Sequence, residues 1–229
     1  MAEEASRLHP LTGHKEFDGL IADFSRLKDP AEIEGAHDQI WDRFGTEGAV
    51  FISDMAAFSS TSRKMGVCHY LKMIHRARQT IAPVIQANNG ILLKCDADNT
   101  YAFFAKTVDA IQAAFDCNAA VYAGNRKHAA DERIDLSIGI DYGRVLLIGD
   151  SDFFGDPVNT ASKLGEDLAV KAEVLVTERA LAKSNFEIPE RAERMVARIS
   201  DIEIEYVRMR MTEHKEIATA ASPPRNDVA

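Results

Sequence analysis

One short stretch, AVFISDMAAFSS at positions 49–60, constrains the fold of this chain more than any other. Its apolar run, Val50 to Ile52, has the pattern of a strand that is buried on both faces. A carboxylate, Asp54, follows where that strand ends, and the hydroxyl groups of Ser59 and Ser60 suit the beginning of the next helix. Backbone N–H groups at such a helix start can bind an anion. The stretch therefore predicts a metal ligand beside a phosphate-binding turn, with an aspartate that merely solvates a strand end as the ordinary alternative.

Length and charge limit what the rest of the chain can be. With 229 residues, 46% of them apolar, the chain can form one sizeable core with extensions. A net charge of −9 argues against a general affinity for nucleic acid or anionic membranes, so a bound polyphosphate would need the help of metal ions. No apolar signal segment or membrane span is expected. Cys68, Cys95 and Cys117 lack metal-ligand spacing and are interpreted as reduced core residues of a cytoplasmic protein.

The first 46 residues form a predicted N-terminal helical extension. Apolar residues recur at helical spacing from Phe17 to Leu27, which indicates an amphipathic helix. A second helix should begin with Asp29 as its N-cap and Pro30 in its first turn, and should end at Gly45. These helices either pack against the core or serve as a dimerising or regulatory element that a partner could contact.

Residues 47–211 are interpreted as a single α+β domain, and residues 212–229 as a disordered tail. The order of the predicted elements favours a ferredoxin-like, antiparallel-rich sheet with flanking helices. After the first strand, the sequence predicts a helix over 61–88, a hairpin of 91–95 and 100–104, and a helix over 105–123. A second hairpin, of 134–140 and 145–148, is expected to turn at Asp141-Tyr142-Gly143. There follow a helix capped by Asp156, a strand over 174–177, a short helix over 178–183, and a hairpin of 195–199 and 202–209.

Four segments of this domain resemble class III adenylate/guanylate cyclase catalytic domains. They are FISDMAAFSS, GILLKCDADNTYAFF, IDLSIGIDYGRVLLIG and FFGDPVNTASKLG, and they fall in the order and at the spacing of that family. Each motif alone is weak, whereas four in order over residues 47–210 are specific. The resemblance implies a lyase that cyclises a nucleoside triphosphate in signal transduction and releases pyrophosphate.

The resemblance assigns the metal and phosphate contacts by position. Asp54 and Asp98 match the two metal aspartates, with the backbone carbonyl of Met55 as a further ligand. Hard carboxylate oxygens suit two Mg²⁺ or Mn²⁺ ions per site. The turn from Phe58 through Ser59 to Ser60 matches the phosphate-binding turn, and Arg144 matches a phosphate-contacting arginine.

The resemblance also assigns base recognition and catalysis. Lys94 and Asp152 match the pair that reads adenine, since lysine can donate to N1 and aspartate can accept from the exocyclic amine, so ATP is the expected substrate. Asn159 matches the residue that orients the transition state, and Lys163 stands where the family usually has an arginine. Lysine lacks the guanidinium fork, so slow turnover is expected. Residues 159 and 163 share one face of the predicted helix, and a solvated face is the structural alternative.

In this family the metal pair and the base-reading pair of one site come from opposite subunits. This chain carries both sets, which implies a homodimer with two composite sites. Two alternatives remain open. The chain could be a catalytically weak or inactive cyclase-like module that binds nucleotide or only dimerises, because Lys163 departs from the family and Asp96 adds a second hairpin carboxylate beside Asp98. A diguanylate cyclase or polymerase-palm enzyme shares the two-aspartate arrangement, but the hairpin typical of diguanylate cyclases is missing.

Overall fold

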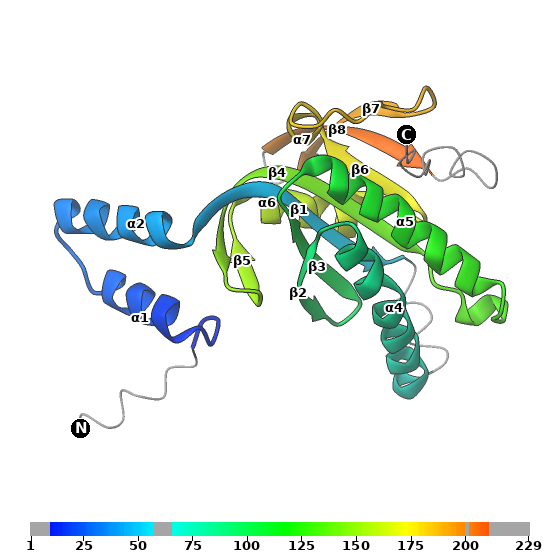
Figure 1. Cartoon of the computed structure of the whole chain (residues 1–229), viewed down its shortest axis with the longest axis horizontal. Helices are drawn as coiled ribbons and strands as arrows, with labels where there is room; N and C mark the ends of the chain where they lie inside the picture. Colours follow the sequence, from blue (N-terminus) through cyan, green and yellow to red (C-terminus); the bar gives the residue numbers. More distant parts are fainter. Residues whose placement is uncertain (1–9, 57–65, 200–201, 211–229) are drawn as a thin grey trace, which may run out of the picture.

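A mixed sheet organises the chain in the computed structural model, which describes residues 10–56, 66–199 and 202–210. Its strands lie in the order β2-β3-β1-β4-β6-β8-β7, and the short strand β5 pairs with β4 (Figure 1). Strands β4 and β6 run parallel, whereas the other pairs along this path are antiparallel. The strands are β1 (Gly45–Met55), β2 (Ile91–Asp96), β3 (Asn99–Phe104), β4 (Leu136–Ile148), β5 (Asp152–Phe154), β6 (Glu173–Thr177), β7 (Glu193–Ile199) and β8 (Ile202–Arg210).

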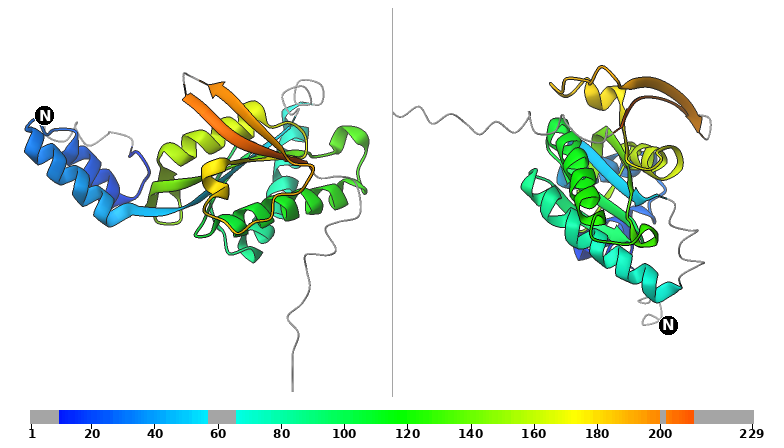
Figure 2. Two further views of the ribbon diagram at one scale, coloured as in Figure 1. Left: turned by 90° about the horizontal axis from the view of Figure 1, so that it is seen from above. Right: turned by 90° about the vertical axis from the view of Figure 1, so that its right-hand side faces the viewer.

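Helices cover both faces of this sheet (Figure 2). Helices α4 (Val67–Ala87) and α5 (Thr107–Asn125) pack on one face, where Phe51 of β1 belongs to the same buried cluster as Ile81 and Ile111. Helix α6 (Asp156–Ser162) packs on the other face, in a cluster with Ile52 of β1. A π-helix, η3 (Lys163–Leu168), continues α6, and η2 (Ala130–Glu132) and α7 (Glu178–Leu181) are short. Strand β1 is therefore buried on both faces, as its apolar run predicted.

The order of strands and helices confirms the predicted ferredoxin-like core. Strand β1, helix α4, the β2–β3 hairpin, helix α5 and strand β4 follow one another in the chain, and the four strands lie side by side as β2-β3-β1-β4. Helix α4 connects β1 to β2, helix α5 connects β3 to β4, and both pack on the same face of the sheet. This arrangement brings the end of β1 beside the tip of the β2–β3 hairpin.

Two helices precede the sheet, as predicted. Helix α1 (Lys15–Phe24) and helix α2 (Pro30–Phe44) extend to one side of the domain in Figure 1. Asp29 is the N-cap of α2, because its Oδ1 accepts bonds from the N–H groups of Ala31 (2.9 Å) and Glu32 (3.2 Å). Phe17 and Phe44 pack on Ile148 at the end of β4. The two helices therefore pack against the sheet, which was the plainer of the two interpretations of this segment.

The second predicted hairpin is wrong, because Leu136–Ile148 form the single strand β4. Asp141 and Gly143, which suggested a turn, pair instead with Val50 and Gly48 of β1. The Asp141 carboxylate is satisfied inside the protein by the side chains of Thr177 and Arg179. Gly143 leaves room for helix α6, since a Cβ atom there would lie 2.9 Å from Pro157 Cγ. Packing across the strand thus overrides the local turn signal.

Several smaller expectations also need correction. Gly155 is the N-cap of α6, and Asp156, predicted to cap this helix, binds Arg179 instead. Cys68 is exposed and Cys95 is half-buried, so Cys117 alone of the three cysteines lies in the core. Burial raises the pKa of the Cys117 thiol. Among the residues that the structure describes, no helix is both long and apolar enough to cross a membrane.

Candidate functional site

The carboxylates of Asp54 and Asp98 come together where strand β1 ends. The last pairing of β1 with β3 joins Ser53 to Thr100, so Asp54 lies level with the turn between β2 and β3, which contains Asp98. The pKa of Asp54 is raised to about 6, first by burial and then by the negative charge and the hydrogen bond of the neighbouring Asp98 carboxyl. The two side chains that the sequence pointed to are thus in direct contact.

A third carboxylate, Glu166 on the π-helix, belongs to the same surroundings. Its charge contributes to the raised pKa of Asp54. The pKa of Glu166 is itself raised, chiefly by partial burial, while hydrogen bonds with Ser162 and Tyr101 act in the opposite direction. Sequence reasoning did not select Glu166, because the four-residue spacing of α6 gave no sign that the helix widens to a π-helix after Ser162.

The hairpin that carries Asp98 is held in a tight conformation. Ala97 has φ +47°, in the left-handed region that favours glycine. Arg78 of helix α4 donates from Nη2 to the carbonyl oxygens of Ala97 (2.9 Å) and Cys95 (3.2 Å). These bonds fix the backbone on either side of Asp96, so the turn that presents Asp98 is anchored to the helical layer.

The donors at this end of β1 fit a hard divalent cation. Two carboxylates and the backbone carbonyl of Met55 offer oxygen ligands of the kind that Mg²⁺ and Mn²⁺ prefer. The Met55 side chain is buried in the core, so only its backbone could take part. Within the described residues no group of three or more His, Cys, Asp or Glu side chains is arranged to hold a metal ion. Oxygens of substrate and water would have to complete the coordination.

Lys94 and Asp152 form an ion pair between β2 and β5. Lys94 Nζ lies 2.7 Å from Asp152 Oδ1, and the same oxygen accepts a bond from the backbone N–H of Phe153 (2.8 Å). The Asp152 side chain is 16% exposed and the Lys94 side chain 40%, so the pair opens toward solvent. The sequence pairing of these two residues, 58 positions apart, therefore corresponds to a direct contact.

Tyr101 connects this ion pair with Glu166, the third carboxylate. The Lys94 ammonium lies 5.2 Å from the centre of the Tyr101 ring, within the range of a cation–π interaction. At the other end, the Tyr101 hydroxyl accepts from Asn99 Nδ2 (3.4 Å) and interacts with Glu166. Sequence reasoning missed Tyr101, although its place opposite Lys94 in the hairpin could have indicated it.

Arg144, a predicted phosphate contact, lies away from the carboxylate pair in the same protomer. It stands opposite Glu47 in the β1–β4 register, whereas Asp54 stands opposite Ser137. Seven residues of strand separate the two levels, or ~23 Å at the usual rise per residue. The Arg144 guanidinium packs on Trp41 of helix α2, 4.5 Å from the ring centre.

Asn159 and Lys163 lie on the face of the sheet that α6 covers, opposite α4 and α5. Asn159 is exposed in the middle of α6, and Lys163 is the first residue of the π-helix. The 2.8 Å bond from the Ala169 N–H to the Leu164 carbonyl marks the wider turn, a feature that recurs at functional sites. Phe58, Ser59 and Ser60, predicted to bind phosphate, lie outside the described residues.

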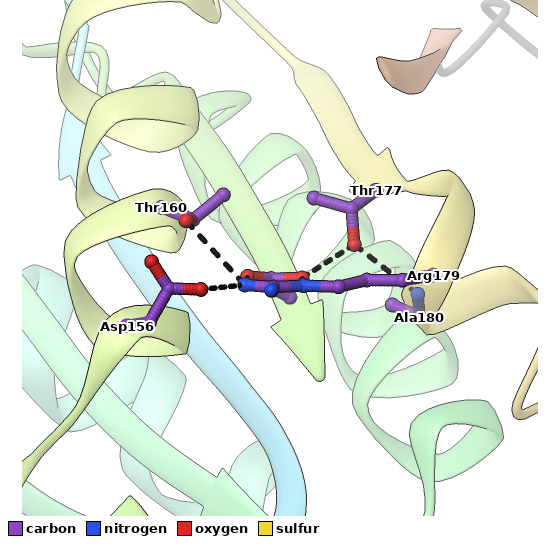
Figure 3. A network of polar contacts seen from close by, with 6 residues as sticks. Asp156, Thr160, Thr177, Arg179 and Ala180 are labelled. Carbon is purple, nitrogen blue, oxygen red and sulfur yellow. Dashed lines mark hydrogen bonds and ion pairs between the residues drawn. The ribbon is translucent and has the colours of Figure 1, made fainter. Parts of the chain in front are cut away.

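Helix α6 is fastened to the sheet by a polar cluster that is buried at Asp141 and exposed at Asp156 (Figure 3). The Asp141 side chain is 0% exposed and accepts from Thr177 Oγ1 (2.6 Å) and Arg179 Nε (2.7 Å). Arg179 Nη2 bonds the other Asp141 oxygen and also reaches Asp156 Oδ2 (2.6 Å). Hydrogen bonding to Asp141 raises the pKa of Arg179, so this cation stays charged.

Solved structures with the same architecture are nucleotidyl cyclases. An adenylate/guanylate cyclase/hydrolase from Silicibacter pomeroyi superposes with a TM-score of 0.62 at 23% identity, over 74% of this chain and 99% of that chain. A bacterial light-regulated adenylyl cyclase gives 0.62 at 21% identity, over 71% and 52%. The guanylyl cyclase Cya2 gives 0.62 at 15%, over 72% and 91%. The fold of this chain is therefore that of an adenylate/guanylate cyclase catalytic domain, as the four motifs predicted.

A curated protein shares part of the sequence. "Putative adenylate cyclase 3" of Rhizobium meliloti (strain 1021) is 26% identical over 130 residues, which are 57% of this chain. The match spans about a fifth of that protein, 22% of its length. No protein-family model matches the chain.

Proposed function

We propose that this protein is an adenylate cyclase, which converts ATP to 3′,5′-cyclic AMP and pyrophosphate. The observation that carries the proposal is the Lys94–Asp152 ion pair at 2.7 Å, in a fold whose solved members cyclise nucleotides. Lysine donates and aspartate accepts, which is the pattern that adenine N1 and its amino group require. Guanine presents a donor at N1 and a carbonyl beside it, so the same pair would fit GTP poorly.

The reaction forms a bond between the ribose 3′-oxygen and the α-phosphorus and breaks the bond from that phosphorus to the β-phosphate bridging oxygen. Two divalent cations, when bound, would lower the pKa of the 3′-hydroxyl and neutralise the triphosphate. Asp54, Asp98 and the Met55 carbonyl would hold them. Asn159 would orient the reacting phosphate, and Lys163 would stabilise its added charge as a point charge. The proton of the 3′-hydroxyl leaves to water or to a phosphate oxygen.

The proposed assembly is a homodimer with two composite sites. Each site would take its carboxylate pair from one subunit and its Lys94–Asp152 pair, Asn159 and Lys163 from the other. The expected location is the cytoplasm, and helices α1 and α2 would be available to a regulatory partner, because they lie at the side of the sheet.

The deciding experiment measures cyclic nucleotide formation by the purified protein with ATP or GTP, in Mg²⁺ and separately in Mn²⁺. Cyclic AMP formed in preference to cyclic GMP supports the proposal. Cyclic GMP in preference would overturn the assignment of Lys94 and Asp152. No product at concentrations where the dimer forms would favour the alternative, a weak or inactive nucleotide-binding or dimerisation module. Slow turnover alone does not distinguish the two, so ATP binding is measured in parallel.

Mixing two inactive variants tests the composite site directly. Asp54→Asn removes one metal ligand and Lys94→Ala removes one base contact, so neither homodimer should be active. A mixed dimer contains one site with both defects and one intact site. Equal mixing produces half mixed dimers, so about a quarter of the wild-type activity should return if dimers of this symmetry form. No recovery after exchange of subunits would contradict the composite arrangement.

A further inference from the structure

A single arginine joins helix α6 to the central strands of the sheet. Arg179, on α7, lies between Asp141 of β4 and two residues of α6, Asp156 and Thr160 (Figure 3). Its Nη2 donates to Asp156 Oδ2 at 2.6 Å and approaches Thr160 Oγ1 at 3.5 Å. Thr177 completes the cluster, because it donates to Asp141 and accepts from the Ala180 N–H (3.2 Å), which holds the start of α7.

The buried side of this cluster fixes the arginine in place. Asp141 is fully buried, and the guanidinium fork satisfies both of its oxygens. The direction of the remaining Nη2 bonds is therefore set by the sheet. Since α7 follows β6 directly, Arg179 itself also comes from the end of the strand beside β4. The bonds to Asp156 and Thr160 consequently hold α6 in a fixed position relative to the sheet.

Helix α6 needs such an external support. It has only seven residues before it widens into η3, too few for an α-helix to be stable without tertiary contacts. On the sheet side, glycines allow it to approach closely: a Cβ atom at Gly139 would lie 2.2 Å from the Ala161 carbonyl oxygen. Close packing there limits how deeply α6 sits, and the Arg179 bonds oppose rotation about its own axis.

Rotation of α6 would move the proposed transition-state residues. At 100° per residue, Asp156 and Thr160 form one stripe of the helix, and Asn159 and Lys163 form the next stripe, ~60° away. A rotation that breaks the Arg179 contact therefore displaces Asn159 and Lys163 together. Displacements on the order of 1 Å at reacting groups can reduce rates by about 10²-fold.

We propose that Arg179 is a positioning residue of the cyclase reaction, and that it sets the rotation of α6 and hence the approach of Asn159 and Lys163 to the substrate. This inference rests on the proposed function. Arg179 would act through α6 and need not touch the nucleotide.

The test weakens the contact on the α6 side and leaves the buried pair intact. Replacing Arg179 would strand the buried Asp141 charge and threaten folding. Asp156 is 63% exposed, so Asp156→Asn keeps the helix start while it removes the charge that Arg179 binds. Asp109→Asn is the matched control, because it makes the same change in the first turn of α5, away from this cluster. Asp156→Glu serves as the conservative variant.

The first readout, amide hydrogen exchange over residues 156–168, needs no activity. Asp156→Asn should speed exchange there about threefold or more, with β4 unchanged, while Asp109→Asn should leave this segment unaffected. Unchanged exchange would overturn the inference. If the wild-type protein forms no cyclic nucleotide, the proposed function fails, whereas this measurement still decides whether Arg179 orders α6.

The second readout is kinetic. Asp156→Asn should lower kcat about tenfold with KM for ATP little changed, since the contact orients the transition state and does not bind the base. Asp156→Glu should recover part of the loss. In an Asn159→Ala background the same substitution should cost much less, because both changes act on one step. Additive losses, or an equal loss in the Asp109→Asn control, would contradict the positioning role.

Discussion

Replacing Asp54 with asparagine should stabilise the metal-free protein. The pKa of Asp54 is raised from 3.8 to about 6 in the folded chain, so the folded state binds this proton more tightly than the unfolded state does. This tighter proton binding stabilises the folded state below about pH 4, and the stabilisation is lost as the pH rises through 6. Above that pH the ionised Asp54 carboxylate is held at a cost, first because it is partly buried and second because it lies beside Asp98, whereas an asparagine amide could donate to Asp98.

The size of the effect follows from this shift. A pKa difference of about two units corresponds to ~3 kcal/mol of folding free energy, if the ionised carboxylate loses all of it. Asp54 is only partly buried, so solvent screening reduces the expected gain to about 1 kcal/mol. In a domain of this size that raises Tm by roughly 2–4 °C. The advantage of the variant should grow between about pH 4 and about pH 7, where the wild-type carboxylate ionises.

The assay is thermal unfolding in EDTA at several pH values, repeated with Mn²⁺ or Mg²⁺. Metal at 100 times its dissociation constant should stabilise the wild type by about 2.7 kcal/mol and the variant much less, so the order of the two Tm values should reverse. Asp96→Asn, in the same hairpin, is the control and should show neither effect. A variant that is less stable than wild type at every pH in EDTA would refute the argument from burial and repulsion of Asp54, and a wild type insensitive to metal would refute the metal site.

Four further substitutions probe other parts of the chain. Gly139→Ala should destabilise the protein by about 3 kcal/mol in denaturant unfolding, because the new Cβ would lie 2.2 Å from a carbonyl oxygen of α6; a neutral result would mean that α6 is free to shift. Ala97→Gly should stabilise it by up to ~1 kcal/mol, since φ +47° is strained for alanine; a loss of stability would show that chain entropy dominates. Arg144→Ala should change the fluorescence of Trp41, the single tryptophan, in otherwise folded protein; an unchanged spectrum would exclude the contact in solution. Lys163→Arg should raise turnover, because the guanidinium fork can bind two phosphate oxygens; an equal or lower rate would mean that the site is adapted to lysine.

The parts of the fold that could be predicted from sequence depend on short-range signals. The N-cap Asp29, the turn at Ala97-Asp98 and the doubly buried run of β1 each follow from residues within a few positions of one another. The contact of Lys94 with Asp152 is long-range and came from the family resemblance, because nothing in the spacing of two residues 58 apart indicates an ion pair.

The parts that could not be predicted depend on partners distant in sequence. Asp141 resembles a turn residue until Arg179 and Thr177 are seen to satisfy its carboxylate inside the protein. Arg78 gives no local sign that it binds the hairpin carbonyls. The π-helix is equally hidden, since its sequence, KLGEDL, also suits an α-helix. Local sequence rules fail most around α6, where Asp156 binds Arg179 and does not cap the helix, and where the helix widens after Ser162.

Under the proposed function, the charges of the two half-sites favour their combination in a dimer. One half-site gathers the carboxylates of Asp54, Asp98 and Glu166, a set that repels a triphosphate unless cations intervene. The other half-site combines the near-neutral Lys94–Asp152 pair, which suits a base, with Lys163, whose one charge leaves most of the phosphate charge unbalanced. Divalent ions at the first half-site, together with Lys163 of the partner subunit, would supply the missing positive charge where the triphosphate lies. Neither half-site of one protomer meets both demands, so under the proposed function catalysis should depend on protein concentration as steeply as dimer formation does.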